Sequence, residues 1–134
     1  MVNKTWRKIA YGFKTVIRIV ALEHSKIIGQ TAIYSFTSPN PSLYEEGQGI
    51  VLPEYRNQKI LEKCLGYGHQ VVYPQLQIEQ VWAEAVCNHI FTQKAGARLG
   101  YFETGLELDL MPASSYVKEQ SSQGRVAAFL MFNL

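Results

Sequence analysis

A strand, a helix and a second strand follow one another in the middle of this chain, and this order constrains the fold more than any other feature. Residues 43–52 and 79–86 have the composition of strands, and residues from about 57 to 73 carry apolar side chains at helical spacing. Pro74 is expected to end that helix. Strands joined through a helix pair in parallel, because a tight turn cannot connect them. The sequence therefore predicts a sheet with a parallel pair of strands and helices packed on it.

The remaining strands are expected near both ends of the chain. They are residues 14–22, 27–36, 101–110 and 125–133. The first two are separated by the polar segment EHSK, so they predict an antiparallel hairpin. A short helix that Asn88 caps and Gly100 ends precedes the last two. The predicted order is β-β-β-α-β-α-β-β, a mixed α/β sheet.

Composition indicates one globular domain, residues 1–134, and excludes a disordered or fibrous chain. Hydrophobic residues make up 47% of the sequence and charged residues 18%, with a net charge of +2. The basic residues are scattered, so nucleic-acid binding is not indicated. Cys64 and Cys87 lie far apart without a histidine cluster, so no metal site is predicted. The longest apolar run, residues 126–132, is too short to cross a membrane, and a cytoplasmic location is expected.

The segment GQGIVLPEYRNQKILEKCLGYG is the one that indicates chemistry. A strand ends at Pro53, and a basic turn with Arg56 and Lys59 leads into a helix. The free N–H groups at a helix N terminus bind anions such as phosphate, although a solvated turn is an equally good interpretation of these residues alone. Glycine within the strand, at Gly47 and Gly49, indicates a bulge or a close approach by another group.

The pattern V-x-P-x-x-R-x-x-x-I, formed by Val51, Pro53, Arg56 and Ile60, resembles the acetyl-CoA-binding motif of the GCN5-related N-acetyltransferases (GNATs). The segment LGYFE at residues 99–103 resembles that family's "LGF.E" ending. Residues 84–114 resemble, more narrowly, the acetyltransferase-like domain of some bacterial ATPase–acetyltransferase two-part proteins. The resemblance covers roughly residues 14–134.

The resemblance implies a GNAT-like acyl-CoA N-acyltransferase fold: a splayed, mostly antiparallel sheet flanked by helices and shortened at the N terminus. It implies acetyl-CoA as co-substrate, with pantetheine beside the bulged strand and pyrophosphate on the loop amides. The implied cofactor-binding residues are Ile50, Val51, Leu52, Arg56, Asn57, Gln58, Lys59, Ile60, Leu61, His89 and Thr92.

Several positions depart from the family pattern. Lys59 and Leu61 replace two loop glycines, and Asn57, which tolerates left-handed backbone, replaces a third. Restoring glycine at both Lys59 and Leu61 is expected to strengthen CoA binding. Gly96 occupies the position of a tyrosine proposed to reprotonate the leaving thiolate, so another acid or water would serve. The first dozen residues are too few for the family's N-terminal elements. The acceptor site is therefore expected to be open or completed by a partner chain, or the chain is a remnant of a longer two-part protein.

The catalytic candidate is Glu84, a carboxylate inside an apolar strand, which would act as the general base. A structural ion pair with an Arg or Lys on a neighbouring strand is the alternative. Glu45 and Glu46 face opposite sides of the sheet, so one of them is a second candidate. His24 and His69 are expected at the surface.

The predicted function is acetyl transfer from acetyl-CoA to an amine of unknown identity by direct attack, with the oxyanion held by the bulge amides around Ile50 to Leu52. The alternative is a degenerate, non-catalytic GNAT-like module that binds CoA weakly or mediates protein interactions. A homodimer or a partner domain is left open, because exposed sheet edges favour pairing.

Overall fold

The computed structural model describes residues 7–11, 16–35, 40, 42–116 and 124–133. The start of the predicted strand 14–22 and the end of the predicted strand 27–36 lie outside the described residues. The chain divides into two compact units, residues 1–80 and 81–134. The prediction of a single domain stays a prediction, and the two units are described in turn.

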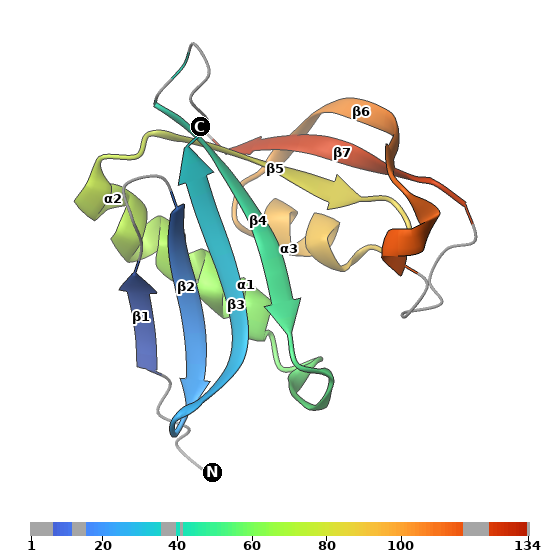
Figure 1. Ribbon diagram of the computed structural model, residues 1–134. Helices are drawn as coiled ribbons and strands as arrows, with labels where there is room; N and C mark the ends of the chain where they lie inside the picture. The colour runs from blue at the N-terminus through green and yellow to red at the C-terminus, as the bar shows by residue number, and fades with distance from the viewer. Residues whose placement is uncertain (1–6, 12–15, 36–39, 41, 117–123, 134) are drawn as a thin grey trace. The chain divides into compact units, whose positions relative to one another are not determined.

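Four strands form an antiparallel array in the first unit (Figure 1). They are β1 (Arg7–Tyr11), β2 (Val16–Glu23), β3 (Lys26–Ser35) and β4 (Leu43–Val51). The predicted hairpin is confirmed as β2 and β3, joined at the turn that contains His24. Strand β1 was not predicted, because its basic and apolar residues carry little β-branched signal.

The glycines of β4 flank a bulge, as the sequence predicted. Pairing with β3 shifts register so that Ala32 lies opposite Gly47 and Gln30 opposite Ile50. Between them Gln48 adopts a left-handed backbone with φ of 54°. The bulge therefore contains a non-glycine residue in a conformation that L-amino acids rarely adopt.

A helical segment follows β4 and differs from the prediction at both ends. It comprises η1 (Pro53–Tyr55), α1 (Ile60–Tyr67), the π-helix η2 (Gly68–Val72) and α2 (Tyr73–Leu76). The helix begins at Ile60 rather than near Asn57, because Asn57 and Lys59 have positive φ. Pro74 does not end it. It lies in the first turn of α2, where a missing N–H is tolerated.

Glycines allow α1 to pack closely on the sheet, where it lies along one face of β2–β4 (Figure 1). A Cβ atom at Gly29 of β3 would lie 2.7 Å from Cγ2 of Ile60. One at Gly49 of β4 would lie 2.9 Å from Cδ1 of Leu61. The Leu61 side chain therefore occupies the space beside the bulge that a larger residue would fill.

A polar cluster is buried between this sheet face and the helices. Glu46 of β4 is 4% exposed and accepts a hydrogen bond from the Tyr73 hydroxyl. His69, on the π-helix, has Nε2 3.7 Å from Oε2 of Glu46, and its ring packs edge-on against that of Tyr73. The expectation that His69 lies at the surface is wrong: its side chain is 17% exposed, because the π turn directs it toward β4.

The second unit contains three strands and a helix. They are β5 (Gln80–Val86), α3 (Phe91–Arg98), β6 (Phe102–Met111) and β7 (Val126–Asn133), with the 3-10 turn η3 (Ala113–Tyr116) before β7. β7 pairs antiparallel with both β5 and β6. Gly100 ends the helix with φ of 86°, as predicted, but Ile90 rather than Asn88 is the N-cap residue. Nε2 of Gln93 donates hydrogen bonds to the carbonyl oxygens of Val86 and His89, and these bonds stabilise the turn before the helix.

We expect Tyr73→Phe to lower the free energy of unfolding by about 1–3 kcal/mol, because the buried Glu46 carboxylate loses a donor. Urea denaturation measures this. The matched control is Tyr44→Phe, which removes a hydroxyl that makes no hydrogen bond to the described residues and should change stability little. Equal effects of the two substitutions would contradict the prediction.

A double-mutant cycle tests the contact between Leu61 and Gly49. Leu61→Ala leaves a void and Gly49→Ala introduces a clash, each expected to cost about 1–3 kcal/mol of stability. In the double variant the new Cβ occupies the vacated space. The stability loss of the double variant should therefore be smaller than the sum of the two single losses by at least about 0.5 kcal/mol. Strict additivity would show that the two residues do not pack together.

Candidate functional site

The turn between β4 and α1 is built by local hydrogen bonds. The Tyr55 amide donates to the Leu52 carbonyl (2.9 Å), and the Arg56 amide donates to that of Pro53 (3.2 Å). Nε of Arg56 lies 3.4 Å from the Val51 carbonyl oxygen. The Arg56 side chain is thus bent back along the end of β4, and most of it is exposed.

The loop that enters α1 has the backbone of a glycine loop without its glycines. Asn57 and Lys59 have φ of 60° and 57°, in the left-handed region. Lys59 is the N-cap residue of α1, and no side chain caps this helix end among the described residues. The first-turn N–H groups of α1 therefore have no partner within the helix, and Arg56 and Lys59 are exposed beside them.

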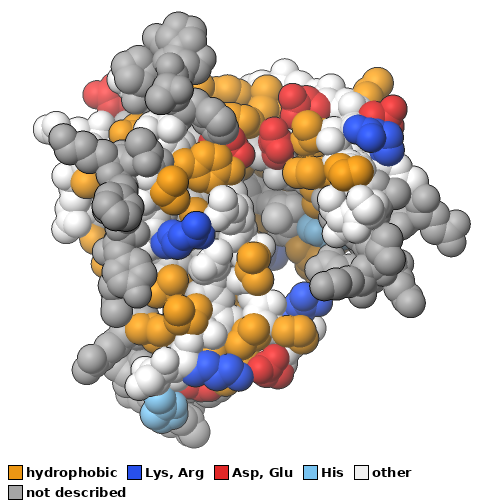
Figure 2. All heavy atoms as spheres, viewed as in Figure 1, with side chains coloured by type: hydrophobic (Ala, Val, Ile, Leu, Met, Phe, Trp, Pro, Cys, Tyr) orange, Lys and Arg blue, Asp and Glu red, His pale blue; other side chains and the backbone are white. Residues whose placement is uncertain are grey.

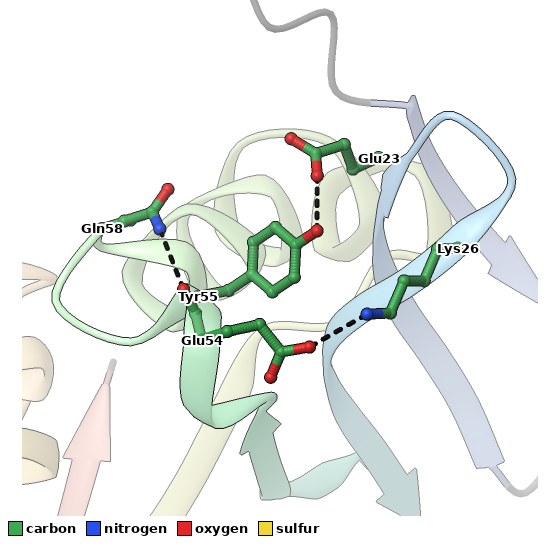
Figure 3. Close-up of polar contacts among 5 residues, drawn as sticks. All are labelled: Glu23, Lys26, Glu54, Tyr55 and Gln58. Carbon is green, nitrogen blue, oxygen red and sulfur yellow. Dashed lines mark hydrogen bonds and ion pairs between the residues drawn. The ribbon is translucent and has the colours of Figure 1, made fainter.

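Polar contacts to the β2–β3 hairpin anchor the η1 turn (Figure 3). Lys26 Nζ lies 2.9 Å from Oε1 of Glu54, and the Tyr55 hydroxyl donates a hydrogen bond to Glu23. These bonds lower the pKa of Glu54, raise the pKa of Lys26 and raise the pKa of Tyr55. Tyr55 thus remains a neutral donor, and its ring lies beside Lys26. The same figure shows the Gln58 amide turned toward the Glu54 carbonyl.

The predicted oxyanion donors, the N–H groups of residues 50–52, differ in availability. The Leu52 N–H donates to the Ile28 carbonyl (2.9 Å) and is therefore occupied. N–H groups alternate in direction along an antiparallel strand, so that of Val51 points away from β3. Of Val51 and Leu52, only Val51 therefore has its N–H directed away from β3.

The two carboxylates of β4 face opposite sides of the sheet, as predicted. Glu46 is buried beneath the helices. Glu45 is half-buried on the other face and accepts a hydrogen bond from the Tyr34 hydroxyl, directly across on β3. Of these two, Glu45 is the one that a solvent molecule or ligand can approach.

Glu84 lies half-buried on β5, opposite Leu130 of β7. By strand alternation it shares a face with Trp82 and Val86, away from the buried Val81. Glu84 has a polar or electrostatic partner, and β7 itself contains no Lys or Arg. The roles of Glu84 as a base and as a member of a structural ion pair both stay predictions.

Two of the predicted cofactor residues carry buried polar atoms at the start of α3. Nδ1 of His89 and Oγ1 of Thr92 are inaccessible to solvent, and neither has a hydrogen-bond partner in the described part of the chain. The His89 ring packs against Phe91, with centroids 5.5 Å apart. Buried polar atoms without partners are costly, so these positions suit a ligand that supplies hydrogen bonds.

Gly96 has a packing reason for lacking a side chain. It is buried in α3, and a Cβ atom there would lie 3.0 Å from Cε of Met131 on β7. A tyrosine would not fit this position without moving the helix from the sheet.

Sequence reasoning did not find the contacts that hold the bulge. Nη1 of Arg18 donates to Oε1 of Gln48 across 2.9 Å, and Oγ1 of Thr31 donates to the Gly47 carbonyl across 3.1 Å. The residues are far apart in sequence, so only the paired glycines signalled a special backbone there.

The described residues offer no group of three or more His, Cys, Asp or Glu side chains arranged to hold a metal ion. None of their helices is long and apolar enough to cross a membrane. In the view of Figure 2, Lys and Arg side chains are scattered, and some lie beside Asp or Glu side chains.

No family model matches the sequence, and no curated protein does. Solved structures are similar to it. The ribosomal-protein-S18-alanine N-acetyltransferase of Escherichia coli aligns at 14% identity and TM-score 0.69, over 90% of this chain and 70% of that one. A GNAT-family acetyltransferase of Streptococcus pneumoniae aligns at 11% identity and TM-score 0.75, over 92% and 68%.

A Bacillus anthracis protein named for streptothricin acetylation, in complex with acetyl coenzyme A, aligns at 15% identity and TM-score 0.67, over 90% of this chain and 63% of that one. The chain thus spans about two thirds of the length of these structures. At such low identity the likeness concerns the fold. The chain has the α/β fold of the GCN5-related N-acetyltransferases, which confirms the resemblance carried by the motif at residues 51–60.

Proposed function

We propose that this protein is an acetyl-CoA-dependent N-acetyltransferase located in the cytoplasm. The observation that carries the proposal is the backbone of the loop before α1. Asn57 and Lys59 adopt the left-handed conformation for which the family motif uses glycine, although the sequence has none in this loop. The amide-lined turn is therefore retained despite the substitutions.

The residues present fit acetyl-CoA as co-substrate. The uncapped N terminus of α1, with Arg56 and Lys59, would hold the pyrophosphate by N–H donation and positive charge. His89 and Thr92 would donate or accept the hydrogen bonds that their buried atoms now lack. The acetyl coenzyme A held by the Bacillus anthracis structure supports this choice of ligand.

The chemistry needs a neutral amine, a base and a donor to the thioester oxygen. The amine attacks the thioester carbon, a C–N bond forms, and the C–S bond breaks to release the CoA thiolate. The Val51 N–H would stabilise the negative charge that develops on the carbonyl oxygen. Glu45 or Glu84 would accept the amine proton. Because Gly96 carries no donor, the proton that neutralises the thiolate would come from water or another group.

Leu61 is compatible with this site. Its side chain packs against Gly49 of β4, so it does not need the space of the bound pyrophosphate. The effects of glycine at residues 59 and 61 on CoA binding are therefore expected to differ. We expect a benefit from glycine only at Lys59, where it relieves a left-handed backbone.

A second candidate function is a non-catalytic module that binds CoA weakly or mediates protein interactions. The observation that favours it is Gly96, whose packing against Met131 leaves no room for a proton-donating side chain. An acetyltransferase-like domain without turnover would retain the same helix packing.

Calorimetric titration with acetyl-CoA tests the first proposal. We expect micromolar binding that Arg56→Ala weakens about tenfold, because one charge-assisted hydrogen bond to phosphate is lost. Arg98→Ala, at the end of α3, is the control with the same charge change. No binding up to millimolar acetyl-CoA would favour the interaction module instead.

Lys59→Gly should raise the free energy of unfolding by about 1 kcal/mol, because glycine adopts φ of 57° without strain. Gln58→Gly is the matched control: it has no positive φ to relieve and should reduce stability. Thermal or urea unfolding distinguishes the two. A stability loss in both variants would show that the loop is not strained at Lys59.

A further inference from the structure

The left-handed Gln48 must be held in place by its surroundings. Such a backbone costs roughly 1–2 kcal/mol for a residue other than glycine, and it persists only where neighbouring contacts compensate. Gln48 is exposed and lies between two glycines, so packing of its own side chain in the core does not supply that compensation.

Arg18 supplies a contact from the sheet face opposite α1. Its guanidinium donates from Nη1 to Oε1 of Gln48 at 2.9 Å, although Arg18 is on β2 and Gln48 on β4. Arg18 of β2 lies opposite Ala32 of β3, and Ala32 lies opposite Gly47 of β4. Because Ala32 and Gly47 are small, the long Arg18 side chain can cross β3 and reach the bulge.

The other face of the sheet secures the two flanking glycines. The Thr31 hydroxyl, which is fully buried, donates to the Gly47 carbonyl, and Leu61 packs on Gly49. The bulge is thus held from both sides. The contact between Arg18 and Gln48 is the one that acts directly on the left-handed residue.

The bulge decides which amides face away from β3. It inserts one extra residue into β4 relative to β3, and a shift of one residue reverses the direction of each N–H beyond it. With the bulge as observed, Leu52 pairs with Ile28 and the Val51 N–H points away from β3. If β4 slipped by one residue relative to β3, the N–H of Val51 would point toward β3 and that of Leu52 would point away from it.

From this arrangement we propose that Arg18 and Gln48 are positioning residues for recognition of the acetyl group. Their contact keeps the bulge in the register that aims the Val51 N–H at the thioester oxygen. This inference rests on the proposed function. Its consequence for specificity is that the contact between Arg18 and Gln48 favours acetyl-CoA over free CoA, which lacks the thioester oxygen.

The experiment compares the Kd values of acetyl-CoA and CoA, measured by calorimetry on the full chain. We expect the wild-type protein to prefer acetyl-CoA by roughly three- to tenfold, the effect of one hydrogen bond. Arg18→Met should bring the ratio close to one while the Kd of CoA changes less than about twofold, because the pyrophosphate loop is untouched. Arg98→Met, with the same charge change, should keep the wild-type ratio.

The double variant Arg18→Met/Gln48→Gly provides a rescue. Glycine adopts the left-handed conformation without support, so the bulge and the preference for acetyl-CoA should return. If Arg18 only contributed to the overall stability of the protein, Gln48→Gly would not restore the preference for acetyl-CoA.

The outcomes separate the two proposals. A wild-type protein that binds neither compound overturns the proposed function, and this inference with it. A wild-type protein that binds both equally, or an Arg18→Met variant that retains the preference, overturns only the inference.

Discussion

The bulge of β4 is the constraint on which the rest of the first unit depends. Gly49 lacks a Cβ, so Leu61 can pack directly on the strand and bring the start of α1 against it. The one residue inserted at the bulge also sets the direction of the N–H groups that follow. One irregularity thereby controls both how the helix packs and which amides of the strand end remain available.

The loop between β4 and α1 shows how a backbone can be retained when its usual residues are absent. Asn57 and Lys59 are left-handed without being glycine. The turn before them is tied to the β2–β3 hairpin through Glu54 and Tyr55 (Figure 3). Exposed pairs of this kind contribute little to stability, so their effect here is to orient the turn.

Local pattern was sufficient to predict much of this structure. The strand-like runs identified β2 to β7 but not β1, the paired glycines indicated the bulge, and Asn57 was correctly expected to tolerate left-handed backbone. Local pattern failed where a neighbour distant in sequence decides the outcome. Pro74 does not end the helix, and His69 is turned inward against Glu46, because the π segment redirects the chain.

The sequence by itself determined the order of the elements, the motif with Arg56 and the alternation of Glu45 and Glu46, since these follow from spacing along one chain. Only the tertiary structure decided which glutamate is covered by helices, that Leu61 packs on Gly49, and that Arg18 reaches Gln48. The physical reason is that these contacts join side chains from different strands and helices. Their meeting depends on register and helix placement, which no local pattern encodes.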